Sequence, residues 1–223
     1  MKLYDCLIAP NPRRVRIFLD EKGIEIEKQE INILIGENLK PDFLAVNTRG
    51  IVPVLELDDG TRIDEAAAIW RYFEETQPDP PLMGRNAREK AIVDSWERRA
   101  DQDGMLSARD FIRNQVPVFV GRGHPGRSID SQIPDLVERG KNGMRAFHDL
   151  LEGQLETSEF VACDHFTVAD ITALCAVDLG VLGEFPGLDG YPAIRRWHTA
   201  VSARPSVEDW VTNIQTALAA LAG

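Results

Sequence analysis

The pattern of hydrophobic and polar positions changes near residue 77 of this 223-residue chain. Before that point, short runs of alternating apolar and polar residues, typical of half-buried strands, are interleaved with segments of helical spacing. Residues 24–33 show this alternation, and Asp58-Asp59-Gly60 between two apolar runs indicates a hairpin. This order of elements predicts a small α/β domain over residues 1–77. Its predicted strands are residues 2–7, 24–33, 52–57 and 61–63, and its predicted helices are residues 12–22, 41–45 and 65–75.

After Gln77 the strand signals stop. The consecutive prolines Pro80 and Pro81 interrupt both helix and strand, so we expect a linker over residues 78–87. Residues 88–223 then predict an all-helical domain. Glycines and prolines break the helical spacing over residues 116–131, where we expect an irregular loop. The predicted helices are residues 88–107, 132–155, 168–179, 192–203 and 207–221.

Charge and composition exclude several classes of partner. A net charge of −11 argues against nucleic acid and against anionic membrane surfaces, because both require clustered Lys and Arg. No apolar run approaches the roughly 20 residues that span a bilayer, and the N-terminus reads directly into a strand without a signal peptide. The three cysteines form no CxxC pair, so we predict reduced thiols and neither a disulfide framework nor a metal site. A cytoplasmic protein is expected.

The segment from Val52 to Ala66 carries the most informative chemistry. Pro53 stands in a strand-like run, where proline belongs at a strand start, a bulge or an edge, and the Val52–Pro53 bond is a candidate cis peptide. Glu65 and Ala66 open a helix, where unpaired backbone N–H groups bind anions. Together these features predict a site that holds a small peptide-like ligand by its backbone and its carboxylate.

A second motif opens a helix in the second half of the chain. Thr167 followed three residues later by Asp170 resembles a capping box, and Phe166 is placed to staple the helix entry. Asp170 could be a catalytic acid or a buried cap that sets the helix geometry, and we favour the cap. Losing such a cap typically costs about 1 kcal/mol.

Three motifs in this order resemble the glutathione transferase family. The resemblance covers essentially the whole chain, and the order of the motifs makes it more specific than any one of them. It implies an α/β thioredoxin-like N-terminal domain plus an all-α C-terminal domain, a homodimer, and glutathione as co-substrate. The motifs are Val52-Pro53, Asp64-Glu65-Ala66-Ala67-Ala68-Ile69 and Phe166-Thr167-Val168-Ala169-Asp170-Ile171.

The resemblance also implies a role for individual residues. Val52, before the cis Pro53, would pair through its backbone with the cysteinyl unit of glutathione. Glu65 would bind the ligand's ammonium, and the N–H of Ala66 would bind its α-carboxylate. The residues expected to contact the glycyl carboxylate are Asn38 and Lys40.

The chain departs from the family pattern at two positions. The family commonly has Ser at the position of Ala66, and the missing hydroxyl should weaken ligand binding by about 1 kcal/mol. The position that often carries the thiol-activating Ser or Thr is Ala9. Asn11 is the candidate catalytic residue, as a donor to the sulfur; the alternative is a turn residue that caps the first helix. The Pro-Asn loop resembles that of bacterial members that act as glutathione-dependent disulfide reductases.

These observations favour a glutathione transferase that uses glutathione thiolate against a small electrophile or a disulfide. Two alternatives stay open: a non-catalytic protein of the same fold that acts through protein contacts, and a glutathione-dependent dehalogenase or ether-cleaving lyase. The family relation puts the second substrate between the loop after the first strand and residues 96–115. Arg109 and Arg113 there either bind an acidic substrate or pair with neighbouring aspartates.

Overall fold

The computed structural model divides into two compact units. The first unit comprises Met1–Pro80 and Arg113–Ile133, and the second comprises Pro81–Ile112 and Pro134–Gly223. The structure describes residues 1–126, 131–182, 185, 187–207, 210–212, 214 and 216.

The first unit is built on a mixed four-stranded sheet with the order β2-β1-β3-β4. β1 runs parallel to β2, which requires the crossover connection that α1 supplies, whereas β1–β3 and β3–β4 are antiparallel. The β3–β4 pair aligns Leu55 with Ile63, which confirms the hairpin predicted around Asp58-Asp59-Gly60. The strands are β1 (Lys2–Asp5), β2 (Glu27–Glu30), β3 (Val54–Glu56) and β4 (Arg62–Asp64).

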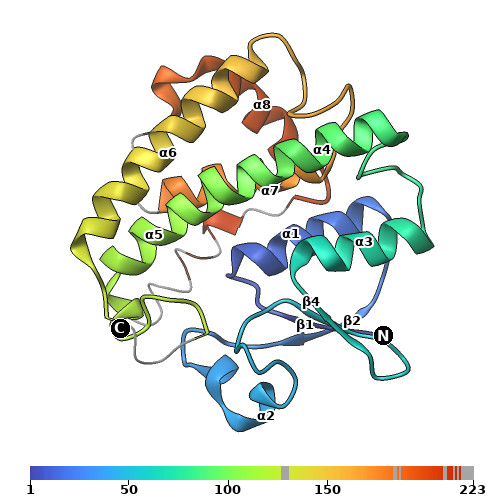
Figure 1. Cartoon of the computed structure of the whole chain (residues 1–223), viewed down its shortest axis with the longest axis vertical. Coiled ribbons are helices and arrows are strands. Elements are labelled where there is room, and N and C mark those ends of the chain that lie inside the picture. The colour runs from blue at the N-terminus through green and yellow to red at the C-terminus, as the bar shows by residue number, and fades with distance from the viewer. Residues whose placement is uncertain are drawn as a thin grey trace. The chain divides into compact units, whose positions relative to one another are not determined.

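Two helices cover one face of this sheet (Figure 1). α1 and α3 contact each other, and the rings of Phe18 and Trp70 stack between them with centroids 6.0 Å apart. Both helices lie where helical spacing predicted them. The helices are α1 (Pro10–Glu21), α2 (Pro41–Leu44) and α3 (Ala66–Thr76), with a 3-10 turn η1 (Glu37–Leu39) before α2.

The prediction of a half-buried strand over residues 24–33 was wrong in one respect. Only Glu27–Glu30 pair as a strand, which lies at the edge of the sheet, and all four side chains are exposed. Ile24 and Ile31, which created the alternating pattern, are buried outside the strand. The periodicity thus marked the flanking connections rather than a strand face.

The second unit consists of helices, as predicted. The helix expected over residues 88–107 is longer than its pattern suggested, because a π-helical turn, η2, joins α4 to α5 and the helical path continues to Gln115. The irregular loop expected over residues 116–131 belongs to the first unit and contains the 3-10 turn η3 (Pro117–Phe119). The helix expected over residues 207–221 falls largely outside the described residues. The elements are α4 (Ala87–Arg99), η2 (Ala100–Met105), α5 (Leu106–Gln115), α6 (Pro134–Leu155), α7 (Val168–Leu182), η4 (Leu188–Gly190) and α8 (Pro192–Ser202).

α7 is the central helix of this unit. Its residues are buried from Val168 to Gly180, and it contacts α4, η2 and α8. A helix that is apolar on every side is expected at the centre of a helical domain. None of the helices in the described part of the chain is long and apolar enough to cross a membrane.

Asp170 is the buried cap of α7, as favoured above. Its carboxylate accepts hydrogen bonds from Val161 N at 2.9 Å, from Thr167 N and Oγ1 at 3.0 and 3.2 Å, and from Trp197 Nε1 at 2.9 Å. The side chain is fully buried, so the interpretation as a catalytic acid is wrong. Asp170 instead joins the start of α7 to α8 and to the preceding loop.

Candidate functional site

A buried arginine, Arg16, forms hydrogen bonds to the loop between β1 and α1. Arg16 Nη1 donates to Asp5 Oδ1 at 2.7 Å and to the Cys6 carbonyl at 3.2 Å, and its Nη2 donates to the Leu7 carbonyl at 2.9 Å. The loop therefore leaves the sheet at a defined angle and delivers Ala9 as the N-cap of α1. The sequence carried no signal for this role, because the partners lie 9 to 11 residues earlier, at the end of β1 and in the loop.

Asn11 lies in the first turn of α1 and is exposed. It is not the helix cap, so the alternative of a capping turn residue is wrong; Ala9 occupies the N-cap without a side-chain hydrogen bond. The Asn11 Oδ1 accepts from Arg14 Nη1 at 3.1 Å, which leaves the Nδ2–H₂ group as the donor that Asn11 can offer to a ligand. Arg14 itself is buried and lies over the ring of Trp70, with its guanidinium carbon 5.0 Å from the ring centroid.

Two further side chains near this loop, a tyrosine hydroxyl and a cysteine thiol, are engaged or buried. Tyr4 is buried, and its hydroxyl donates to Glu56 Oε2 at 3.3 Å. Cys6 is fully buried, and burial raises the pKa of its thiol to about 11. A thiol with that pKa is almost entirely protonated at neutral pH and is a poor nucleophile.

The Val52–Pro53 bond is cis, as predicted. β3 begins at Val54, so Val52 precedes the sheet ladder, and within the described residues no hydrogen bond engages its N–H or C=O. The preceding loop is held by two side-chain amides: Asn38 Nδ2 donates to the Gly50 carbonyl at 2.7 Å, and Asn47 Nδ2 donates to the Ile51 carbonyl at 3.0 Å. The loop thus presents an unpaired peptide group next to a supported turn.

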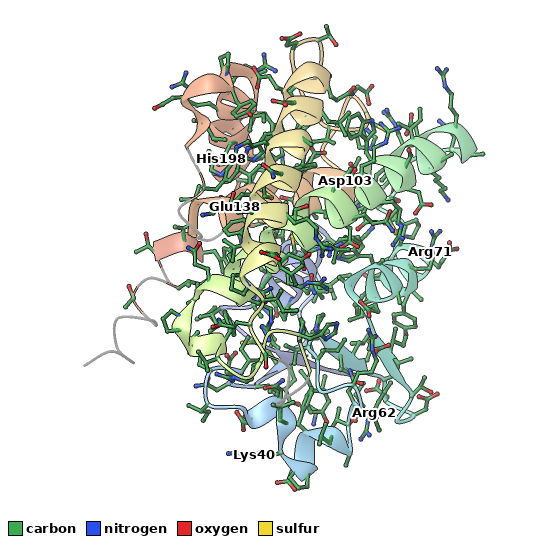
Figure 2. All side chains as sticks on the ribbon, turned by 60° about the vertical axis from the view of Figure 1, so that its left-hand side comes forward. Lys40, Arg62, Arg71, Asp103, Glu138 and His198 are labelled. Atoms are coloured by element: carbon green, nitrogen blue, oxygen red, sulfur yellow. The ribbon has the colours of Figure 1, made fainter. Side chains whose placement is uncertain are left out.

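Asn38 and Lys40 differ in what they can offer a ligand. Asn38 is buried in η1 and supports Gly50 from inside the unit, so its expected contact with the glycyl carboxylate remains a prediction. Lys40 is exposed at the N-cap of α2 (Figure 2), where its ammonium is accessible to an anion.

Glu65 stands at the mouth of α3 in an unusual backbone conformation. Its φ of 70° is the only positive φ of a non-glycine residue in the described chain. Such conformations cost about 1–3 kcal/mol and cluster at ligand sites. The conformation precedes the first turn of α3, where Ala66 N–H has no acceptor within the described residues. An acidic side chain and an unpaired N–H group therefore lie at the same helix start. The acidic side chain is complementary to an ammonium, and the N–H group is complementary to a carboxylate.

The structure adds Arg49 to this cluster. Its Nη1 forms ion pairs with Glu65 Oε1 and, at 3.0 Å, with Asp64 Oδ2. These bonds, first of all the one to Glu65, raise the pKa of Arg49 above its ordinary value. Nothing in the sequence indicated this contact, because Arg49 and Glu65 belong to different strand connections.

A segment from much later in the chain borders the same loop. Arg122 donates to the carbonyls of Ile33 and Leu34 at 2.8 and 3.2 Å, which ties residues 117–126 to the connection that carries Asn38. Gly126 has a φ of +72° and lies so close to Arg49 that a Cβ there would collide with the Arg49 carbonyl oxygen. This wall of the first unit was expected only as an irregular loop.

The arginines considered for the second substrate have partners of their own. Arg109 Nη2 lies 3.1 Å from Asp110 Oδ1, and Arg139 binds the other oxygen of the same carboxylate at 2.7 Å. The guanidinium carbon of Arg113 lies 4.4 Å from the ring centroid of Phe119. For Arg109, the alternative of pairing with a neighbouring aspartate is therefore confirmed.

Comparison with known proteins bears on the fold and the family of this chain. The family model described as glutathione S-transferase, N-terminal domain, matches residues 8–76, and the one described as glutathione S-transferase, C-terminal domain, matches residues 128–205. The chain is 32% identical over 213 residues to Glutathione S-transferase 2 of Saccharomyces cerevisiae, a match that covers 93% of this chain and 88% of the relative. The chain belongs to the glutathione S-transferase family.

Solved structures of glutathione S-transferases share the whole architecture. A glutathione S-transferase domain-containing protein of Marinobacter aquaeolei VT8 superposes with a TM-score of 0.86 at 32% identity, covering 93% of this chain and 100% of the other. A glutathione S-transferase of class Gtt2 from Vibrio parahaemolyticus gives a TM-score of 0.79 at 36% identity, covering 94% and 97%. The thioredoxin-like and all-helical architecture expected from the resemblance is therefore confirmed.

Proposed function

We propose that this glutathione S-transferase family member binds glutathione along Val52 and Glu65 and directs its thiolate at an electrophile or a disulfide. Two features of the first unit carry the proposal. The peptide group of Val52 has no hydrogen-bond partner within the described residues, and α3 begins with the acidic side chain of Glu65 and the free N–H of Ala66. The first suits the cysteinyl backbone of the tripeptide, and the second suits the charged γ-glutamyl end. Relatives named glutathione S-transferase support the same ligand.

Activation of the sulfur rests on Asn11 and on the start of α1. The thiol has an ordinary pKa of about 8.5, so a donor that stabilises the thiolate is needed for reaction at neutral pH. Asn11 Nδ2–H₂ is such a donor, and the positive end of the α1 dipole adds to it. In this proposal Ala9, which replaces the usual hydroxyl, contributes only its place at the helix cap.

A calorimetric titration tests the binding proposal. Losing the charge-assisted bond from Glu65 to the ammonium, worth about 1.5–3 kcal/mol, should weaken glutathione binding about ten- to a hundredfold in Glu65→Gln. Glu75→Gln is the matched control, because Glu75 is an exposed acid in the last turn of the same helix, 3.9 Å from Arg71. Equal affinity in both variants would contradict the assignment of Glu65, and no binding by the unaltered chain at millimolar glutathione would favour the non-catalytic scaffold.

Activity assays then separate the reaction classes. Reduction of 2-hydroxyethyl disulfide would support the disulfide-reductase activity, and conjugation of a chromogenic electrophile would support the transferase activity. Binding of glutathione with neither reaction would point to a dehalogenase or an ether-cleaving lyase. We further propose that the protein is cytoplasmic and forms a homodimer. Light scattering of the purified chain tests the homodimer by its mass.

A further inference from the structure

Three metal-binding residue types meet in the second unit, whereas the residues assigned to glutathione belong to the first. Glu89 lies in the first turn of α4, and Cys163 and His165 lie in the connection before α7. One ligand atom of each lies within 4.8 Å of the other two, and all three residues are half-buried. The Val168 N–H donates to the Leu82 carbonyl at 3.0 Å, which holds the two chain segments side by side.

We propose that Glu89, Cys163 and His165 bind a divalent cation of the zinc class. A thiolate, an imidazole and a carboxylate are the ligands that zinc takes in proteins, and three of them leave a fourth position for water. Bond lengths of about 2.0–2.3 Å in a tetrahedron place ligand atoms about 3.4 Å apart, so the most separated pair must close in by up to about 1.4 Å. Rotations of half-buried side chains supply such a movement without a change in the backbone.

A neighbouring carboxylate contacts the imidazole of His165 and fixes the orientation of its ring. His165 Nδ1 lies 2.9 Å from Asp164 Oδ1, the carboxylate–histidine contact that fixes the tautomer and leaves Nε2 to bind a metal. The other ring nitrogen, Nε2, lies 3.3 Å from the Pro81 carbonyl oxygen.

The charges of the cluster also favour a cation. Arg85 contacts both Glu89 and Asp164, so one guanidinium faces two carboxylates. A divalent ion that displaces the thiol proton would bring the summed charge of the Cys163 thiolate, the Glu89 and Asp164 carboxylates and the Arg85 guanidinium to zero.

A local explanation covers only part of this arrangement. Glu89 Oε2 accepts the Arg85 N–H at 2.9 Å, and Glu89 N–H is capped by Asn86 Oδ1 at 3.1 Å, so Glu89 also serves as a capping-box residue of α4. That role gives no reason for a cysteine and a histidine beside it. The sequence predicted no metal site, because the ligands come from segments more than 70 residues apart and include no CxxC pair.

Cobalt(II) titration of the full chain tests the proposal, because Co²⁺ bound by a thiolate gives a near-ultraviolet charge-transfer band. We expect that band at one equivalent, its loss in Cys163→Ser, and at least about tenfold weaker binding in His165→Ala and Glu89→Gln. His124→Ala, which removes an exposed loop histidine outside the cluster, is the matched control and should bind cobalt as the unaltered chain does. Circular dichroism confirms that each variant is folded.

Two results would overturn the site. One is the absence of a thiolate band at millimolar cobalt in the folded, reduced protein. The other is a band that persists in Cys163→Ser, which would assign the thiolate to another cysteine. A zinc-dependent rise in the melting temperature of the unaltered chain, absent in Cys163→Ser, provides a second readout that does not depend on activity.

Discussion

Arg16 Nη1 lies 2.7 Å from Asp5 Oδ1, and both side chains are buried beneath the loop that leads to Asn11. The same guanidinium also binds the Cys6 and Leu7 carbonyls. One residue of α1 thus neutralises a buried charge and shapes the connection on which the proposed chemistry depends.

Replacing Arg16 by Met should destabilise the protein strongly. Removing one member of a buried pair leaves an uncompensated charge at Asp5 and typically costs about 3–5 kcal/mol. Guanidinium unfolding measures the loss, and the double variant Asp5→Asn, Arg16→Met should recover part of it because no charge remains buried. A loss below about 1 kcal/mol in the single variant would show that the pair adds little to the free energy of unfolding.

Replacing Asn11 by Ala should lower turnover with glutathione by at least about tenfold while leaving glutathione affinity nearly unchanged. Without the donor, the pKa of the bound thiol rises, so the rate profile should shift to higher pH. Asn142→Ala is the matched control, because Asn142 accepts from Arg145 at 2.6 Å on the exposed side of α6 in the same three-residue spacing as Asn11 and Arg14. An unchanged rate in Asn11→Ala would return Asn11 to a purely structural role.

Replacing Arg49 by Met should weaken glutathione binding about fivefold, the effect of about 1 kcal/mol. Glutathione carries two carboxylates and one ammonium, so its net charge is negative and the Arg49 guanidinium attracts it. The same guanidinium orients the Glu65 carboxylate toward the ligand's ammonium. The unfolding free energy should change by less than about 1 kcal/mol, because the ion pairs of Arg49 are exposed. The glutathione affinity of Arg49→Lys should lie between those of the unaltered chain and Arg49→Met, because lysine keeps the charge but lacks the planar guanidinium. Unchanged or tighter binding in Arg49→Met would show instead that Arg49 competes with the ligand for Glu65.

His148 should make the protein less stable in mild acid. The side chain is buried, neither ring nitrogen has a hydrogen-bond partner within the described residues, and burial lowers its pKa from 6.5 to about 4. The unfolded chain therefore takes up a proton at higher pH than the folded chain does, and stability is lost as the pH falls from the unfolded pKa toward the folded one. Between about pH 7 and pH 5 this loss amounts to about 2 kcal/mol.

His148→Phe separates this effect from the titration of other groups. Phenylalanine fits the surroundings of Phe147, Phe185 and Tyr191 and does not titrate. Urea unfolding at several pH values should show a smaller acid loss in the variant than in the unaltered chain. Parallel pH dependences of the two proteins would rule out a buried neutral histidine as the cause.

Replacing Asp170 by Ala should destabilise the second unit without altering glutathione affinity. The variant removes the acceptor of four hydrogen bonds and leaves the N–H groups of Val161, Thr167 and Trp197 buried and unpaired, each at a cost of about 1–3 kcal/mol. Thermal unfolding and a glutathione titration below the melting temperature measure the two effects. A loss of glutathione affinity in the folded variant would contradict the purely structural role.

The sequence by itself determined the features that depend on neighbouring residues. Apolar spacing predicted the helices and the hairpin, a proline within a strand-like run predicted the cis bond before Val54, and Thr167 with Asp170 predicted the cap of α7. Each of these follows from backbone geometry over a few residues, which the local sequence specifies.

The tertiary structure alone decided which distant side chains meet. It paired Arg49 with Glu65, buried Arg16 beneath the loop after β1, and exposed the strand whose neighbours had suggested burial. It also brought Glu89 to Cys163 and His165. Such contacts depend on how the sheet and helices fold back on one another, and the residues involved carry no mutual spacing in the chain. For that reason the fold and the cis Val52–Pro53 bond could be predicted from the sequence, whereas the charges around the proposed site could not.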